Sequence, residues 1–195
     1  MDKQYDNYSS DTIQRNVSNP ASKFSSVCFD WSETVVQAVI LVVLLMTFLF
    51  RMFTVDGKSM MNTLFNGDKV AVIRWKYVPK NGDVVVIKHG EEYNKPLIKR
   101  VIATEGQTLK INFDTGKVFV NGEKLNETYI KERMWLEGDA EIPEVIPEGH
   151  CFVMGDNRNN SSDSRNKVIG LIPNENIVGK AKFVIYPFNR IKVIE

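Results

Sequence analysis

The sequence is poor in the residue types that most often build metal sites and catalytic triads. Its 195 residues include only two histidines and two cysteines. His89 stands in a predicted turn and His150 at the start of a predicted strand, so neither is favoured as the base of a Ser-His-Asp triad. No histidine, cysteine and carboxylate cluster has ligand spacing, so we expect no metal. Cys28 and Cys151 flank a long apolar run and are expected to be free thiols.

Strong charge and nucleotide-binding motifs are also missing. The net charge is +1, which predicts no nucleic-acid surface. The tripeptide Gly57-Lys58-Ser59 resembles the end of a phosphate-binding loop. That motif requires a glycine five positions earlier, where this chain has Met52. No internal repeat is visible, and the length leaves room for one globular unit with a small insertion.

The most prominent feature present is the apolar run VVQAVILVVLLMTFLF at residues 35–50, which contains no charge. A helix of that length covers about 24 Å, which is short of a hydrocarbon core of ~30 Å. Apolar flanks, with Trp31 and Arg51 suited to the interfaces, predict a single transmembrane anchor over residues 33–53. The polar residues 1–32 are predicted to be a disordered tail. The alternatives are a buried helix of a soluble domain and a cleaved signal peptide, although no small-x-small site follows the run.

The chain after the run has the pattern of an all-β domain. Short runs of β-branched and aromatic residues, such as 70–75, 84–88 and 97–103, alternate with turn signals. We therefore predict a β sandwich or open barrel over residues 54–195. A polar, proline-punctuated stretch at about 106–150 is expected to form a smaller insertion within it.

Ser59 lies nine residues beyond the apolar run and would need a base to act as a nucleophile. A free lysine, with a pKa of about 10.4, can serve only if it loses its proton at neutral pH. In a predicted strand, Lys99 shares one face with Leu97 and Val101, and burial on that face would lower its pKa. The alternative at this point is a lysine at a strand edge that reaches water.

Four segments together resemble the four boxes of bacterial type I signal peptidases, in the same order and spacing. They are Ser59-Met60 beyond the apolar run, NGDVVV at 81–86, KRVI at 99–102 and GDNRNNSSDSR at 155–165. The resemblance implies a membrane-anchored serine endopeptidase with a Ser-Lys dyad. It also implies an all-β fold in two antiparallel sheet regions, with no metal or organic cofactor. The single short anchor is more similar to the Gram-positive enzymes than to the two-anchor ones.

The resemblance also implies roles for six residues. Ser59 would be the nucleophile and Lys99 the general base, while four residues support them: Ser161 orients the lysine, Asp163 pairs with Arg165, and Asp156 helps to hold the same segment in place. An orienting partner is physically needed because a neutral amine has free rotors.

Two positions depart from the pattern of the family. Asn62 stands where many members have a turn proline. The turn therefore loses a fixed φ angle, but no catalytic group is lost. Gly57 stands where some relatives place a serine that donates to the oxyanion. We therefore expect the backbone N–H of Ser59 to be the oxyanion donor in this chain.

The implied function is cleavage of signal peptides from exported preproteins after Ala-x-Ala-like sites. The site would lie on the outer side of the cytoplasmic membrane, with the N-terminus in the cytoplasm, and the substrate would bind extended along a strand edge. Charge alone does not determine this orientation. One alternative is a non-enzymatic anchored β module that binds other membrane proteins. Another is a self-cleaving repressor, whose helix-turn-helix the thirty-residue tail cannot supply.

The domain is further expected to dock on the lipid bilayer. Nine extended residues reach at most ~31 Å, so Ser59 must stay near the membrane surface. Adaptable or amphipathic apolar side chains suit such a contact. The candidates are Met60, Met61, Met134, Trp135 and Leu136, and the alternative is that they are ordinary core residues.

Overall fold

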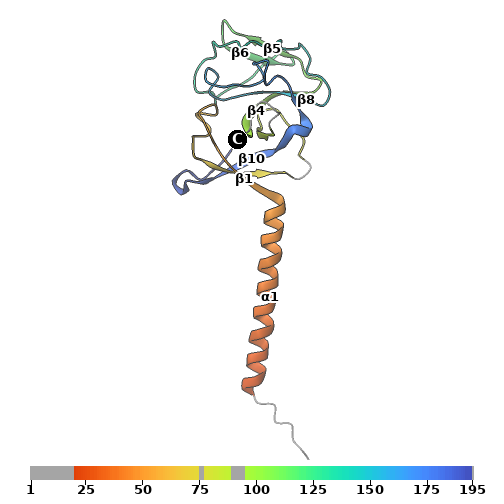
Figure 1. Cartoon of the computed structure of the whole chain (residues 1–195), viewed down its shortest axis with the longest axis vertical. Helices are drawn as coiled ribbons and strands as arrows, with labels where there is room; N and C mark the ends of the chain where they lie inside the picture. Colours follow the sequence, from red (N-terminus) through yellow and green to blue (C-terminus); the bar gives the residue numbers. More distant parts are fainter. Residues whose placement is uncertain (1–19, 75–76, 89–94, 195) are drawn as a thin grey trace, which may run out of the picture. The chain divides into compact units, whose positions relative to one another are not determined.

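The computed structural model describes residues 20–74, 77–88 and 95–194. The chain divides into two compact units, one ending at Leu45 and the other beginning at Met46. The first unit is helical and the second is built from β strands (Figure 1). Each is described by itself.

A single helix, α1 (Pro20–Leu49), contains the apolar run. It begins earlier than the predicted anchor, because Pro20 is compatible with a first helical turn and no proline or glycine follows before residue 50. Residues 20–32 are therefore helical, and residues 1–19 of the expected tail lie outside the described residues. The apolar side chains from Val35 to Leu44 are at least half exposed wherever they are described. Among the described residues, no helix meets the combined length and hydropathy needed to cross a bilayer.

The predicted anchor boundary at residue 53 is wrong at the C-terminal end. Residues Phe50–Thr54 form strand β1, which pairs with β2 (Lys69–Ile73) in antiparallel register from Phe50↔Ile73 to Thr54↔Lys69. Its backbone groups therefore take part in a sheet. An apolar composition alone does not distinguish such a strand from the last turn of a helix.

The second unit contains one large and one small antiparallel sheet, as expected for an all-β domain. The large sheet has eight strands in the order β1-β2-β10-β3-β4-β8-β9, with β11 beside β10. Its further strands are β3 (Val84–Ile87), β4 (Leu97–Thr104), β8 (His150–Met154), β9 (Ile172–Pro173), β10 (Ile177–Tyr186) and β11 (Lys192–Val193). The 3-10 turns η1 (Asn174–Asn176) and η2 (Phe188–Arg190) flank β10.

The small sheet lies within the predicted insertion. It consists of β5 (Leu109–Asn112), β6 (Lys117–Val120) and β7 (Glu123–Lys124). Asn121 and Gly122 join β6 to β7 with φ angles of 51° and 80°, values that suit a tight hairpin turn. Thr108, the residue before β5, forms an isolated antiparallel bridge with Val145 in the rest of the insertion.

Apolar side chains form three buried clusters that hold these elements together. One contains Met60 and Leu64, which fix the connection between β1 and β2. A second, under the small sheet, contains Met134 and Ile146. Met60 is 1% exposed and Met134 is 0% exposed, so both are core residues and the prediction that they dock on a membrane is wrong. Met61 is half-buried.

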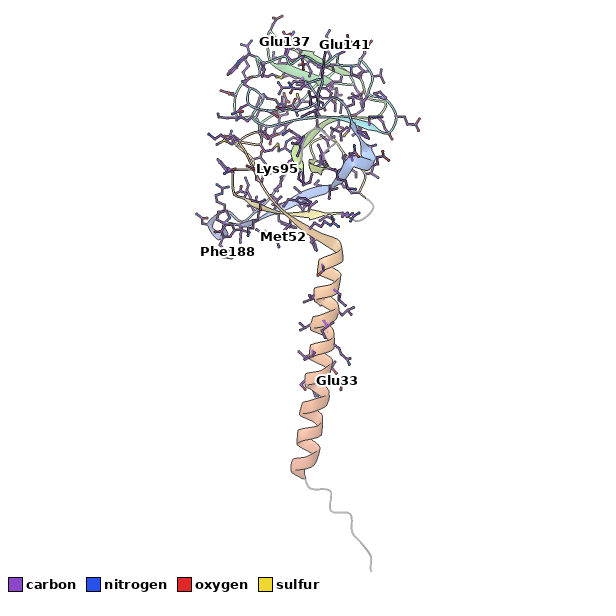
Figure 2. All side chains as sticks on the ribbon, in the orientation of Figure 1. Glu33, Met52, Lys95, Glu137, Glu141 and Phe188 are labelled. Atoms are coloured by element: carbon purple, nitrogen blue, oxygen red, sulfur yellow. The ribbon has the colours of Figure 1, made fainter. Side chains whose placement is uncertain are left out.

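Other apolar side chains of the β unit are exposed, and they lie in at least two places. Met52 and Phe188 lie at one end of this unit, while Glu137 and Glu141 lie at the opposite end (Figure 2). Trp135 and Leu136 precede Glu137 in the chain and are 63% and 46% exposed.

Candidate active site

Ser59 lies in the tight connection that follows β1. Gly57 has a φ of 107°, which a residue with a Cβ rarely adopts, and its N–H donates to Asn66 Oδ1 at 2.8 Å. Val55 and Met60 are buried in the core on either side. We call residues 57–61 the nucleophile turn; the core and the Asn66 bond hold it in place.

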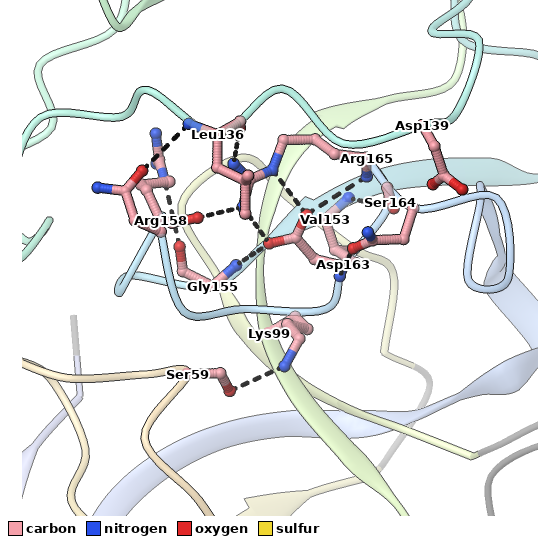
Figure 3. Close-up of polar contacts among 12 residues, drawn as sticks. Ser59, Lys99, Leu136, Asp139, Val153, Gly155, Arg158, Asp163, Ser164 and Arg165 are labelled. Carbon is pink, nitrogen blue, oxygen red and sulfur yellow. Dashed lines mark hydrogen bonds and ion pairs between the residues drawn. The ribbon is translucent and has the colours of Figure 1, made fainter.

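Lys99 reaches Ser59 from the middle of the sheet. On β4 it pairs with Val85, which belongs to a buried apolar cluster. Its side chain is 3% exposed, and Nζ lies 2.9 Å from Ser59 Oγ (Figure 3). The structure thus brings together the two residues that the sequence analysis assigned as a dyad.

Burial lowers the pKa of Lys99 to about 8, from an ordinary value of 10.5. The carboxylates of Asp163 and Asp156 act in the opposite direction, and the Arg165 guanidinium adds to the lowering. None of the described carboxylates forms an ion pair with Lys99. About a tenth of the amine is therefore unprotonated at pH 7, which makes it a usable base.

The pair of Asp163 and Arg165 braces the 155–165 loop. Arg165 donates from Nε to Asp163 Oδ1 at 2.8 Å and from Nη2 to Oδ2 at 2.9 Å. Asp163 Oδ2 also accepts from the Gly155 N–H at 3.0 Å, and Arg165 Nη2 donates to the Arg158 carbonyl at 2.6 Å. Both side chains are almost completely buried. The loop that carries Ser161 is therefore closed on itself by charge-assisted bonds.

Asp156 connects this loop to β4 and to Thr63, two residues after the nucleophile turn. Arg100 donates to it from Nε at 2.9 Å and from Nη2 at 2.8 Å, and Thr63 Oγ1 donates to Asp156 Oδ2. The sequence analysis did not identify Arg100 or Thr63. Strand alternation could have shown Arg100 as a second charged residue on the opposite face from Lys99, where a buried guanidinium requires a carboxylate.

Ser161 lies close to the dyad without bonding to it. Its Oγ is buried and has no hydrogen-bond partner among the described residues. A Cβ added to Gly155 would lie 2.3 Å from Ser161 Oγ and 2.5 Å from the Ser59 carbonyl oxygen. Gly155 is therefore required for the close approach of the loop to the nucleophile turn. The structure does not bond Ser161 to Lys99, so its orienting role stays a prediction.

A groove lies between the two chain segments that directly precede the nucleophile turn and Lys99. Its lining includes residues 53–56 on one side and Lys95, Pro96 and Ile98 on the other. β1 pairs with β2 alone, and β4 pairs with β8 only from Arg100 onward. Each wall therefore has a strand edge without a partner among the described strands.

The structure describes the side chains of one of the two histidines, His150, and of one of the two cysteines, Cys151. His150 contacts the Glu148 carbonyl through Nδ1 at 2.8 Å, and His89 lies outside the described residues. The described part of the chain contains no group of three or more His, Cys, Asp or Glu side chains placed to hold a metal ion. Cys151 is buried and free.

A buried lysine amine beside a serine hydroxyl is the arrangement used by serine–lysine hydrolases, which occur on several folds. The family described as Signal peptidase, peptidase S26, matches residues 28–186, and this chain belongs to that family. Signal peptidase I of Bacillus licheniformis is 39% identical over 175 residues, which cover 84% of this chain and 91% of that protein. Signal peptidase I T of Bacillus subtilis (strain 168) is 38% identical over 188 residues, covering 91% and 95%. The predicted family is confirmed.

A solved structure of a signal peptidase I from Enterococcus faecalis V583 is also similar. It matches with a TM-score of 0.40 and 21% identity, over 53% of this chain and 97% of that chain.

Proposed function

We propose that this chain is a membrane-anchored serine endopeptidase that removes N-terminal signal peptides from exported preproteins. The observation that carries the proposal is the 2.9 Å distance between Lys99 Nζ and Ser59 Oγ, combined with the burial of the lysine. A buried amine beside a hydroxyl can take its proton, whereas a solvated ammonium cannot.

In the proposed reaction Lys99 acts first as a base and then as an acid. The neutral amine accepts the proton of Ser59 Oγ while Oγ attacks the scissile carbonyl carbon. The resulting oxyanion is stabilised by the Ser59 N–H. The Lys99 ammonium then protonates the leaving amine of the mature protein, which leaves an ester on Ser59. A water molecule, deprotonated by Lys99, hydrolyses the ester and releases the signal peptide.

Ser161 is proposed to orient the amine during these steps. Its hydroxyl is buried and has no hydrogen-bond partner among the described residues. It lies beside Gly155, where the loop approaches the carbonyl oxygen of Ser59. The paired Asp163 and Arg165, with Asp156, are proposed to keep the loop in place while this happens.

The substrate is proposed to bind extended in the groove between residues 53–56 and Ile98, with its scissile bond placed at Ser59. A peptide there can add its backbone to the unpaired strand edges, and its alternate side chains then point into the groove wall. The apolar lining residues Phe53, Val55 and Ile98 support small, uncharged side chains before the scissile bond. This agrees with Ala-x-Ala-like cleavage sites.

Residues 33–49 of α1 are proposed to anchor the chain in the cytoplasmic membrane. The support is the uncharged run at 35–50 and the high exposure of its described side chains. The N-terminus is proposed to be cytoplasmic and the β unit extracytoplasmic. In intact spheroplasts, a C-terminal epitope tag should be accessible to antibody and an N-terminal tag should not; the reverse pattern would contradict this orientation.

The membrane-docking surface is proposed to lie on the outer face of β1, β2, β10 and β11. Met52, Ala71, Phe183 and Val193 are direct cross-strand neighbours, so their side chains share one face of the sheet. All but Ala71 are exposed, as are the nearby Tyr186, Phe188 and Ile191. Of the residues predicted from the sequence, the half-buried Met61 and the exposed Trp135 and Leu136 remain alternative candidates.

Quenching of tryptophan fluorescence by brominated lipids can test whether the sheet face contacts the bilayer in the full chain. In reconstituted bilayers, Phe188→Trp should add strongly quenched fluorescence relative to the unsubstituted chain. Val168→Trp is the matched control, because Val168 is 57% exposed but lies outside both surfaces. Equal quenching at the two positions would overturn the proposed docking face.

Cleavage of a preprotein in detergent tests the function directly. The purified full chain should cut a synthetic preprotein once, and mass spectrometry should place the cut after an Ala-x-Ala-like sequence. Ser59→Ala should remove this activity while a cooperative melt is retained. A wild-type chain that binds the preprotein but does not cut it would favour the non-enzymatic anchored module instead.

A further inference from the structure

The nucleophile turn is held from outside by a single residue of the 155–165 loop. The Asn157 side chain donates from Nδ2 to the Lys58 carbonyl oxygen at 3.0 Å. Its backbone N–H donates to the Ser59 carbonyl oxygen at 2.9 Å. Asn157 is 1% exposed. Two consecutive carbonyl groups of the turn are thus bound by one buried residue.

The first of these bonds, together with a longer 3.2 Å bond from the Met61 N–H to the same Lys58 oxygen, sets the direction of a backbone N–H. The Lys58 carbonyl and the Ser59 N–H belong to the same peptide group, which is planar and, in its usual trans form, points the two bonds in opposite directions. A donor that holds the carbonyl therefore fixes the direction of the N–H. Binding the Ser59 carbonyl fixes the next peptide plane as well.

We propose that Asn157 is a positioning residue that aims the Ser59 N–H at the oxyanion formed during peptide cleavage. The inference rests on the proposed function, in which Ser59 is the nucleophile and its N–H is the oxyanion donor. Preorganised donors are effective because they need no reorientation when the charge develops. Gly57 provides no side-chain donor, so the alignment of the backbone donor matters more in this chain.

The chemistry of the side chain supports this role. A carboxamide can donate to a carbonyl while staying neutral, whereas a carboxylate of the same shape can only accept when ionised. Asn157 Oδ1 is buried and has no donor partner among the described residues. Leaving it unsatisfied is unfavourable, so the amide is present here for its Nδ2 bond to the Lys58 carbonyl.

The neighbouring Asn159 provides a matched control. Its Nδ2 donates to the Arg133 carbonyl at 2.9 Å, the same kind of bond that Asn157 makes, and its Oδ1 accepts from the Trp135 N–H. It therefore ties the same loop to a different segment, away from Ser59.

The experiment compares Asn157→Ala, Asn157→Asp and Asn159→Ala in the purified full chain in detergent, with a synthetic preprotein as substrate. Both Asn157 variants should lose about 10- to 100-fold in kcat, because an oxyanion donor is misaligned, while KM stays within about twofold. Asn157→Ala should also keep the pH midpoint of the wild type, since Lys99 is unchanged. Asn159→Ala should keep kcat within about twofold.

Three results would overturn the proposal: a kcat near the wild-type value in Asn157→Ala, an equal loss in Asn159→Ala, or a loss that appears only as a shifted pH midpoint. Loss of the cooperative melt in both Asn157 variants would also overturn it, because the side chain would then be needed for folding. Ser59→Ala, measured in parallel, distinguishes failure of the Asn157 proposal from failure of the proposed function. If that variant still cuts, Ser59 is not the nucleophile, whatever Asn157 does.

Discussion

Two neighbouring cations on β4 are buried on opposite faces of the same strand. Lys99 and Arg100 are 3% and 2% exposed. Arg100 binds both oxygens of Asp156, donates to the Gly82 carbonyl at 2.7 Å and stacks 4.0 Å from the centre of the Tyr129 ring. Lys99 contacts the uncharged hydroxyl of Ser59 and forms no ion pair among the described residues.

The difference shows how one strand can hold both a structural cation and the lysine proposed as the base. A buried cation with a bidentate carboxylate partner stays charged and fixes the packing around it. A buried lysine without such a partner loses part of its affinity for protons, as the lowered pKa of Lys99 shows. The face on which each residue lies therefore decides its role, and the following predictions separate the two.

Replacing the base should have the largest effect. We expect Lys99→Met, like Lys99→Ala or Ser59→Ala, to reduce preprotein cleavage by about 10³-fold or more. Ser59→Cys should keep a trace of activity, because a thiol ionises more readily. Product formation is measured by gel and mass spectrometry, and turnover near the wild-type rate in either alanine variant would disprove the dyad.

The same Lys99→Met change should stabilise the fold at neutral pH. The folded-state pKa is about 8 and the ordinary value is 10.5, so the unfolded chain binds more protons between these values and wild-type stability rises with pH in that window. Below pH 8 the full penalty is present, on the order of 3 kcal/mol. Urea titrations should show Lys99→Met as the more stable protein at pH 7, with a gap that closes by about pH 10.5.

Replacing Arg100 should instead lower the stability of the fold. Arg100→Met leaves the Asp156 carboxylate buried without its partner, which typically costs 3–5 kcal/mol. We expect a large loss of stability in urea, and partial recovery in the double variant Arg100→Met, Asp156→Leu. A small loss in the single variant would mean that Arg100 is not needed to hold the loop.

The pH dependence of cleavage should follow Lys99. Because only the unprotonated amine accepts the Ser59 proton, kcat/KM should rise about tenfold per pH unit below pH 8 and level off above it. Chelators should leave the rate unchanged. A bell centred below pH 7 would point to a histidine, and loss of activity in EDTA would point to a metal.

Local patterns were sufficient to predict the strand that carries Lys99 and two other strands of the large sheet. The predicted segments 70–75, 84–88 and 97–103 correspond to β2, β3 and β4, because β-branched runs between turn signals are a local property. Alternation also placed Lys99 and Arg100 on different faces. It could not show that both faces of β4 are buried, since this depends on contacts with distant parts of the chain, such as the bond from Arg100 to Asp156.

The wrong predictions also concern features that depend on contacts between residues far apart in the sequence. Met60 and Met134 were predicted at the surface but fill the core, and Phe50–Thr54 joined a sheet that is completed only by β10 near the end of the chain. The 157-to-58 contact is equally invisible from one sequence, because two asparagines of the same loop, Asn157 and Asn159, look alike until their partners are known.

The smallest expected effect concerns a third charged pair, at the entrance of the groove. Lys95 Nζ lies 2.7 Å from Asp56 Oδ2 and connects the two groove walls, with both side chains largely exposed. Each partner shifts the pKa of the other, lowering that of Asp56 and raising that of Lys95. Such exposed pairs are weak and screened by salt, so an incoming peptide can displace this one, unlike the pair of Arg100 and Asp156.

We therefore expect Asp56→Asn and Lys95→Met each to lower KM by about two- to fivefold at low ionic strength, because the bridge no longer has to open. The rate constant kcat should not change, since neither side chain contacts Ser59 or Lys99 in the free protein. Above about 0.5 M salt the difference should disappear. The double exchange Asp56→Lys with Lys95→Asp restores the bridge and should return KM to the wild-type value. Single variants whose KM equals that of the wild type at every salt concentration, or an exchange variant that behaves like them, would show that the pair does not restrict entry to the groove.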